Sequence, residues 1–313
     1  VLLDANEKKA EERQWTLAMD CPLLINGYFT QGRYEDIRDA SVIIITAGGK
    51  PEAGRDETRL GAKKCRIMKS VIREIKRVRC EGILLIVSNP VDILTYVALK
   101  ESGFPPARVI GSGTVLDTAR LKYILSEKLE VDSRNVHAFI IGEHGDSELP
   151  VWSCANIYGI GLEDFAKMKG YKSFTSEMEE IYHAVRDSAY EIIKRKGATY
   201  YGIGMAAAKI AEALVRDSHT VAPVSVHLNG EYGLQDLCLS IPTVLGKNGA
   251  EQILEINFNE EEKRKLWQFS RGAEKIIRPD LKKLPPVGLT RRESESRKLL
   301  LDCLKFYCWY LEI

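Results

Sequence analysis

Residues 42–49 read Val-Ile-Ile-Ile-Thr-Ala-Gly-Gly, an apolar and β-branched run that ends in small residues. A second run of this kind, Ile83 to Ser88, ends at Asn89-Pro90. Runs that are apolar at every position predict strands covered on both faces, as in a parallel sheet. Between them, Cys65 to Arg79 carries apolar residues at helical spacing. The alternation of strand and helix predicts a doubly wound α/β fold.

The segments on either side extend this pattern. Val1 to Asp4 is typical of the end of a buried strand that stops at a carboxylate, and Asp92 to Lys100 has helical spacing that ends at Gly103. After Gly113 we expect helices from about Thr114 to Glu130, Glu177 to Lys196 and Ile203 to Asp217, and strands over Val136 to Ile141 and from Pro223 to a turn at Asn229-Gly230. We therefore divide the chain into an α/β domain over residues 1–112, a mixed α+β domain over 113–284 and a tail over 285–313.

The composition narrows the class of protein. Lys plus Arg total 45 and Asp plus Glu total 44, a balance that argues against nucleic acid or an anionic membrane as the main partner. The seven cysteines are scattered without a C-x-x-C pair, so we expect reduced thiols in a cytoplasmic protein and no metal site. No stretch of about 18 apolar residues is present to span a membrane.

The sharpest chemical signal is Ile-Ile-Gly-Glu-His-Gly-Asp-Ser over residues 140–147. His144 lies between two glycines, Gly142 and Gly145, just after an apolar run, where backbone can approach a ligand closely. Imidazole exchanges a proton near neutral pH, so His144 is a candidate general acid and base. A structural histidine is the alternative.

Asp117 and Arg120 lie three residues apart in the predicted helix that precedes this motif. Such spacing places both side chains on one helical face. Asp117 is a candidate acceptor for a ring N–H of His144, and Arg120 is a candidate clamp for a small carboxylate through paired hydrogen bonds. The alternative is an ordinary exposed ion pair.

Together with Asn89-Pro90-Val91-Asp92 and the stretch Gly-Ala-Thr-Tyr-Tyr-Gly-Ile over residues 197–203, these segments resemble the L-lactate dehydrogenases in order and spacing. The resemblance runs from Val1 to about Leu284. It implies a Rossmann domain that binds NAD, followed by an α+β substrate domain. It also implies reversible hydride transfer between NADH and pyruvate, which is an oxidoreductase reaction of glycolysis, fermentation and carboxylic acid metabolism.

The resemblance implies a role for each matching residue. His144 would give a proton to the keto oxygen of pyruvate or take the hydroxyl proton of lactate, Asp117 would orient it, and Arg120 would bind the substrate carboxylate. The other implied contacts are Asn89 and Thr199 for the substrate and Asp4, Ala47, Gly48, Asn89 and Ile203 for NAD. An acidic residue at the adenosine ribose favours NAD over NADP.

Two stretches depart from the family pattern. The 313 residues contain no strand, G-x-G-x-x-G turn and helix to hold a pyrophosphate, so we expect these elements to precede Val1 in a longer chain; a chain that truly begins there we expect to bind NADH poorly or fold unstably. In the loop after Gly48, Glu57-Thr58-Arg59 matches the motif of an arginine that polarises the reacting carbonyl, but two residues late. Arg59 is therefore our candidate for that role, with an exposed charge as the alternative. The same shift leaves the residue that separates lactate from malate enzymes unassigned.

Several alternatives stay open at this level. Another L-2-hydroxyacid dehydrogenase, acting on malate or hydroxyisocaproate, would carry the same dyad and clamp. A catalytically dead relative that acts as a binding protein would explain the absent glycine turn, although it has no need of His144, Asp117 and Arg120 together. The resemblance further implies a homotetramer, with Lys122 and His137 as candidate ligands for fructose 1,6-bisphosphate as an effector.

Overall fold

The computed structural model describes residues 1–4, 8, 11–12, 14, 30–47, 57–196 and 199–268, with only the backbone described for residues 57–60, 62 and 196. Gly48 and the predicted tail, residues 285–313, lie outside the described residues. Within them, strands and helices alternate through the first part of the chain, as predicted. The elements of this part are β1 (Val42–Ile45), α2 (Glu57–Arg77), β2 (Ile83–Ile86), α3 (Val91–Ser102) and β3 (Val109–Gly111), with 3-10 turns at Tyr34–Ile37 and Pro106–Arg108.

The second part of the described chain is a mixture of helices and short strands. Its helices are α4 (Val115–Leu129), α5 (Leu162–Met168), α6 (Thr175–Lys196), α7 (Tyr201–Val215) and a last one within residues 260–268. Its strands are β4 (Val136–His137), β5 (Ile140–Ile141), β6 (Leu149–Pro150), β7 (Asn156–Ile157), β8 (Ile160–Gly161), β9 (Thr220–Asn229), β10 (Gln235–Gly246) and β11 (Gly249–Ile253). Short 3-10 turns occupy Ser133–Asn135, Trp152–Cys154 and Glu231–Gly233.

One sheet runs through both parts, in the order β1-β2-β3-β9-β10-β11. β1, β2 and β3 are parallel, whereas β9, β10 and β11 form an antiparallel meander. The two halves meet where Gly111 pairs with Ser225. The carboxyl end of β3 therefore lies beside β9, a strand more than 100 residues away in the sequence.

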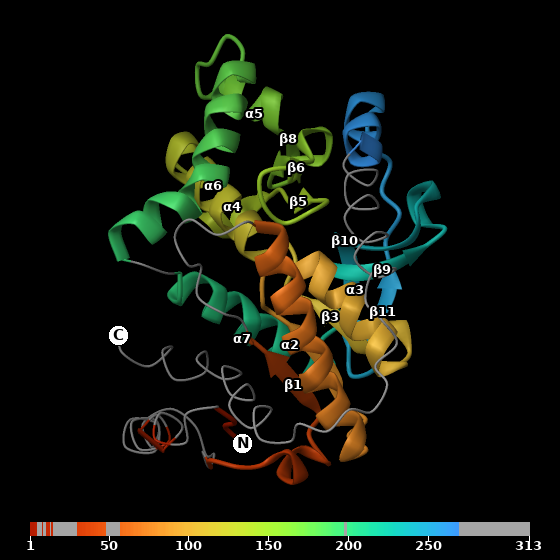
Figure 1. Ribbon diagram of the computed structural model, residues 1–313. Helices are drawn as coiled ribbons and strands as arrows, with labels where there is room; N and C mark the ends of the chain where they lie inside the picture. Colours follow the sequence, from red (N-terminus) through yellow and green to blue (C-terminus); the bar gives the residue numbers. More distant parts are fainter. Residues whose placement is uncertain are drawn as a thin grey trace.

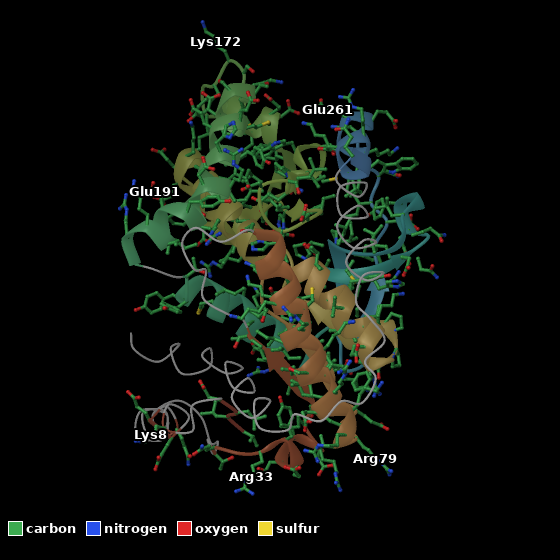
Figure 2. All side chains as sticks on the ribbon, in the orientation of Figure 1. Lys8, Arg33, Arg79, Lys172, Glu191 and Glu261 are labelled. Carbon is green, nitrogen blue, oxygen red and sulfur yellow. The ribbon has the colours of Figure 1, made fainter. Side chains whose placement is uncertain are left out.

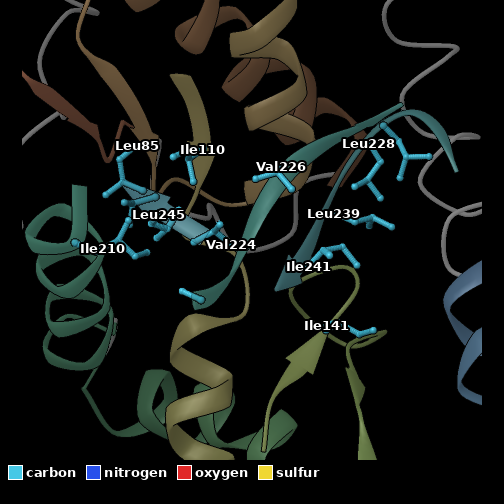
Figure 3. Packing of buried hydrophobic residues seen from close by; sticks show 14 of the residues in the cluster. Leu85, Ile110, Ile141, Ile210, Val224, Val226, Leu228, Leu239, Ile241 and Leu245 are labelled. Atoms are coloured by element: carbon cyan, nitrogen blue, oxygen red, sulfur yellow. The ribbon is translucent and has the colours of Figure 1, made fainter. Parts of the chain in front are cut away.

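Both faces of β2 and β3 are covered, which explains their continuous apolar sequence, whereas Val42, Ile43 and Ile44 of β1 are half-buried. In β2, Leu84 and Ile86 pack into a core formed with α2 and α3, while Ile83 and Leu85 pack into a second core formed with α7, β9 and β10. Figure 3 shows part of this second core, which extends from Leu85 and Ile110 along β9 and β10 toward Ile141.

A third core stabilises the far end of the molecule. It is built from α4, α5, α6 and the short strands, and Figure 1 shows these elements gathered away from β1. The charged residues labelled in Figure 2 lie at the periphery, where Lys172, Glu191 and Glu261 are exposed. In the described part of the chain, helices with the length and hydropathy needed to cross a membrane are absent.

One predicted strand is wrong in its extent. The run from Val136 to Ile141 is two short strands, because β4 pairs with β7 whereas β5 pairs with β6. The chain changes partners at Ala138 and Phe139. The predicted turn at Asn229-Gly230 is confirmed: Gly230 has a φ of +134°, a conformation that glycine adopts without a steric penalty.

Candidate active site

The site begins where β3 ends and α4 starts. Gly113 has a φ of +54°, and a Cβ atom built on it would lie 2.6 Å from the backbone nitrogen of Ser225. Only glycine therefore allows the chain to turn this close to β9. The turn sets the direction of α4, which carries Asp117 and Arg120 one turn further on.

Two threonines at the start of α4, Thr114 directly before the helix and Thr118 within it, form hydrogen bonds to β5, the strand that leads to His144. The Thr114 hydroxyl donates to the Ile140 carbonyl at 2.5 Å, and the Ile140 N–H donates to Oγ1 of Thr118 at 2.9 Å. Beyond β5, Gly142 and Ser240 exchange two backbone hydrogen bonds of 2.9 Å. The loop that carries His144 is thus held by α4 on one side and by β10 on the other.

Asp117 lies between His144 and Arg120. Nδ1 of His144 is 2.6 Å from Oδ2 of Asp117, and Nη1 of Arg120 donates to Oδ1 of the same carboxylate at 3.1 Å. The Asp117 side chain is buried, at 4% exposure, whereas that of His144 is 22% exposed. With Nδ1 bonded to Asp117, Nε2 is the ring nitrogen left to face a ligand. A guanidinium has five N–H donors, so Arg120 keeps donors for a ligand carboxylate.

The surroundings of His144 favour its charged form. Burial by itself lowers the pKa of this imidazole, but the hydrogen bond and the negative charge of Asp117 outweigh it and raise the pKa to about 9. His144 is therefore an imidazolium at neutral pH, ready to donate a proton to a bound carbonyl.

Asp92, to which the sequence pattern assigns no role, is hydrogen-bonded to the backbone of His144. The backbone N–H of His144 donates to Oδ2 of Asp92 at 2.9 Å, and the Ser225 hydroxyl donates to its Oδ1 at 2.6 Å. Burial raises the pKa of Asp92 to about 6, and these two hydrogen bonds oppose the rise. The available signal was the motif at Asn89, in which Asp92 is a carboxylate in the otherwise uncharged first turns of α3.

Glu148 was missed as well. It is 3% exposed, directly before β6, and a carboxylate oxygen of it lies within 4.8 Å of the ligand atoms of Asp117 and His144. Burial, and then the charge of Asp117, raise the pKa of Glu148 to about 8. A glutamate directly before the apolar run Leu149 to Val151 was the only trace of this in the sequence.

Two of the predicted cofactor residues, Ala47 and Asn89, lie just beyond the carboxyl ends of β1 and β2, and Asp4 lies near the start of the chain. Asp4 is 3% exposed and follows Leu2, which forms a parallel bridge with Gln31. Ala47 is buried just beyond β1, and Asn89 is exposed just beyond β2. In an open α/β sheet, ligands bind at these strand ends.

The remaining predicted residues are placed as follows. Thr199 is half-buried before α7, and Ile203 is half-buried in the first turn of α7, against the core that β2 shares with β9. The backbone of Arg59 belongs to the first turn of α2, and its side chain lies outside the described residues. Lys122 lines a cavity between α4 and α7 that His137, exposed on β4, does not line.

Asp117, His144 and Glu148 also have ligand atoms close enough together to bracket a cation. However, Asp117 already accepts hydrogen bonds from His144 and Arg120 on its two oxygens. The geometry is that of a proton network anchored on Asp117. A second group with such spacing, Asp217, His219 and Glu251, lies at the surface and forms ordinary ion pairs.

The sequence of the chain matches two models of known protein families. Residues 1–111 match the model of the NAD binding domain of lactate/malate dehydrogenase, and residues 114–282 match that of its alpha/beta C-terminal domain. The chain belongs to the lactate/malate dehydrogenase family. The fold is accordingly the NAD-binding Rossmann type followed by an α/β domain, as the sequence indicated.

Curated members of the family are similar over nearly their whole length. The chain is 45% identical over 278 residues to the L-lactate dehydrogenase of Acetivibrio thermocellus, an alignment that covers 89% of this chain and 88% of that protein. It is 46% identical over 283 residues to L-lactate dehydrogenase 2 of Bacillus cereus, with 90% of each chain covered.

Solved structures of similar fold are lactate dehydrogenases as well. A lactate dehydrogenase from a Medee basin deep-sea metagenome library superposes with a TM-score of 0.84 at 41% identity over 88% of each chain. The minor L-lactate dehydrogenase of Enterococcus mundtii, in its ligand-bound form, superposes with the same TM-score at 35% identity, over 88% of this chain and 87% of that one.

Proposed function

We propose that the protein is an NAD-dependent L-lactate dehydrogenase that interconverts pyruvate and L-lactate, with His144 as its acid and base. The observation that carries the proposal is the 2.6 Å contact between His144 and Asp117, with Arg120 beside it on the same carboxylate. A proton donor and a carboxylate clamp held on the same carboxylate, Asp117, suit a small 2-keto acid, whose reacting oxygen adjoins its carboxylate. The names of the similar proteins support this substrate.

The residues present fit the cofactor at its two ends. Asp4 supplies a buried carboxylate of the kind that accepts hydrogen bonds from ribose hydroxyls, and the small Ala47 leaves room beyond β1. Gly48, Asn89 and Ile203 would complete the contacts at the nicotinamide end. When bound, NADH supplies the hydride for the carbonyl carbon, and the protein provides orientation and charge.

Each protein group then has one task. Arg120 binds the substrate carboxylate through paired hydrogen bonds, and Asn89 and Thr199 border the substrate. Nε2–H of His144 donates its proton to the carbonyl oxygen as negative charge develops there, and Asp117 stabilises the imidazolium before transfer. Arg59 would polarise the same carbonyl from the α2 side. In lactate oxidation, neutral His144 takes the hydroxyl proton.

Substrate choice is tested by steady-state oxidation of NADH with pyruvate, oxaloacetate and 2-ketoisocaproate. We expect the highest kcat/KM with pyruvate. A higher value with oxaloacetate would make the protein a malate dehydrogenase, and the absence of turnover with all three would favour the binding-protein alternative.

Assembly and regulation follow from the resemblance alone. A homotetramer in the cytoplasm, active in glycolysis and fermentation, is part of the proposal, as are the domain limits 1–112 and 113–284 and the separate tail. Lys122 and His137 remain the candidate ligands for fructose 1,6-bisphosphate. Burial, followed by the charge of Lys209, lowers the pKa of Lys122, and an anion bound beside these two lysines would offset the repulsion between them. Light scattering tests the tetramer, and an unchanged KM for pyruvate on titration with the sugar phosphate would dismiss the effector.

A further inference from the structure

Glu148 is a buried carboxyl group for which the mechanism above has no use. The residue is 3% exposed, and its Oε1 atom has no hydrogen-bond partner among the described residues. Burying an ionised carboxylate oxygen without a donor is costly, so such a group is normally paired or neutral.

The positively charged groups that face Glu148 do not pair with it, whereas its side chain lies within hydrogen-bonding reach of the Asp117 carboxylate. In the described part of the chain the facing groups are Asp117 and Arg120 from α4, His144 from the preceding loop and Tyr182 from α6. Nη1 of Arg120 and Nδ1 of His144 both bond to Asp117, and the Tyr182 hydroxyl donates to the backbone carbonyl of Glu148. Two carboxyl groups thus share the surroundings of one guanidinium and one imidazole, and Asp117 holds both cations.

We propose that Glu148 is a positioning residue that carries a proton at neutral pH and shares it with the carboxylate of Asp117. The bond that forms is a hydrogen bond from the carboxyl O–H of Glu148 to an oxygen of Asp117. On ionisation the proton leaves to solvent, and the site gains one negative charge. Like charges this close resist double ionisation, as in other carboxyl pairs.

The direction of the proton equilibrium supports the assignment. Burial and the charge of Asp117 raise the pKa of Glu148 to about 8, even though His144 and Arg120 pull it down. Burial raises the pKa of Asp92, the other buried acid near His144, only to about 6. Between about pH 7 and pH 9, Glu148 is therefore the carboxyl group of this site that changes charge.

The proton has a consequence for substrate binding, which rests on the proposed function. A neutral Glu148 leaves Arg120 with a single carboxylate partner, Asp117, so the guanidinium remains available to a substrate carboxylate. Above about pH 8 the ionised Glu148 competes for Arg120 and repels the substrate. We expect the KM for pyruvate to rise there by about tenfold, the effect of losing a charge-assisted hydrogen bond.

Infrared difference spectroscopy of the whole protein, without substrate or cofactor, tests the proton directly. The spectrum of the wild type minus that of Glu148→Gln should show the carbonyl band of a protonated carboxylic acid at pH 7, lost by pH 9.5. Asp146→Asn, which removes an exposed carboxylate of the same loop, should leave that band in place. A carboxylate band at pH 7 in its stead would overturn the proposal.

Two further measurements separate this proposal from a structural role and from the proposed function. In Asp117→Asn the acid band should be lost at a lower pH than in the wild type. If the pH at which half of the band is lost is the same in both proteins, the two carboxyl groups do not share the proton. This comparison does not need the Glu148→Gln variant, so it holds even if that variant does not fold. With pyruvate, Glu148→Gln should abolish the alkaline rise in KM, and an unaltered rise would refute the role at Arg120. If no substrate is turned over, the infrared result still decides whether Glu148 holds the proton.

Discussion

The backbone N–H of His144 donates to Oδ2 of Asp92 at 2.9 Å, across 52 residues of sequence. Asp92 stands in the first turn of α3, and its other oxygen accepts from Ser225 on β9. One buried carboxylate therefore joins α3, the catalytic loop and β9. His144 is held through its backbone by Asp92 and through its ring by Asp117.

Asp92 makes stability depend on pH. Because burial raises its folded-state pKa from 3.8 to about 6, the folded state binds more protons than the unfolded state between these values, and stability contributed by Asp92 falls as pH rises through them. The rise corresponds to about 3 kcal/mol. In the Asp92→Asn variant, this decrease in the free energy of unfolding between pH 4 and pH 7 should be absent. Urea unfolding of both proteins at pH 4 and pH 7 measures it, and equal pH dependence in the two would show that Asp92 is not buried as described.

Arg120 is expected to act as a fork. Lysine keeps the charge but not the paired donors, so Arg120→Lys should raise the KM for pyruvate by about tenfold to a hundredfold and change kcat less. The matched control is Arg186→Lys, because Arg186 on α6 forms an exposed ion pair with Asp187. This substitution should leave the KM for pyruvate unchanged. Equal KM values for wild type and Arg120→Lys would remove Arg120 from the substrate.

Thr118 is expected to hold the strand that positions His144. Thr118→Val has the same shape but leaves the N–H of Ile140 without its acceptor, which should lower the free energy of unfolding by about 1–3 kcal/mol. Thr118→Ser keeps the hydroxyl and should recover most of that loss. If the valine and serine variants unfold at the same urea concentration, the hydrogen bond does not matter.

Gly113 is expected to be required for contact as well as conformation. Gly113 and Gly103 both have positive φ. A Cβ atom built on Gly113 would collide with the backbone nitrogen of Ser225, whereas one built on Gly103 would lie in open space. Gly103→Ala should cost about 1 kcal/mol for its backbone conformation alone. Gly113→Ala should cost clearly more in thermal unfolding, and a similar cost for both would argue against the close approach to β9.

Much of the fold follows from local patterns. The runs at 42–46 and 83–88 predict parallel strands, of which β2 is fully buried and β1 half-buried. The helices α2, α3 and α4 are confirmed within a few residues apart from the earlier start of α2. Breaks caused by a change of partner, as between β4 and β5, leave no local trace. They depend on which distant strand is available.

Part of the candidate site can likewise be predicted from local sequence patterns. His144, Asp117 and Arg120 belong to motifs whose spacing indicates their chemistry. Asp92 and Glu148 do not, because a carboxyl group gains its character from distant neighbours: Ser225 lies 133 residues from Asp92. Burial among such neighbours is a property of the folded chain.

The pH dependence of pyruvate reduction by wild type and Asp117→Asn tests the central claim, that His144 is the proton donor and Asp117 keeps it charged. The wild type should lose kcat/KM in two steps, first through the rise in KM assigned to Glu148 near pH 8 and then on a limb near the pKa of His144, about 9. In Asp117→Asn the imidazole loses the partner that offsets its burial, so the limb should move to about 6.5 or below and kcat/KM at pH 7 should fall by about a hundredfold or more. An alkaline limb at the same pH in both proteins would contradict the account.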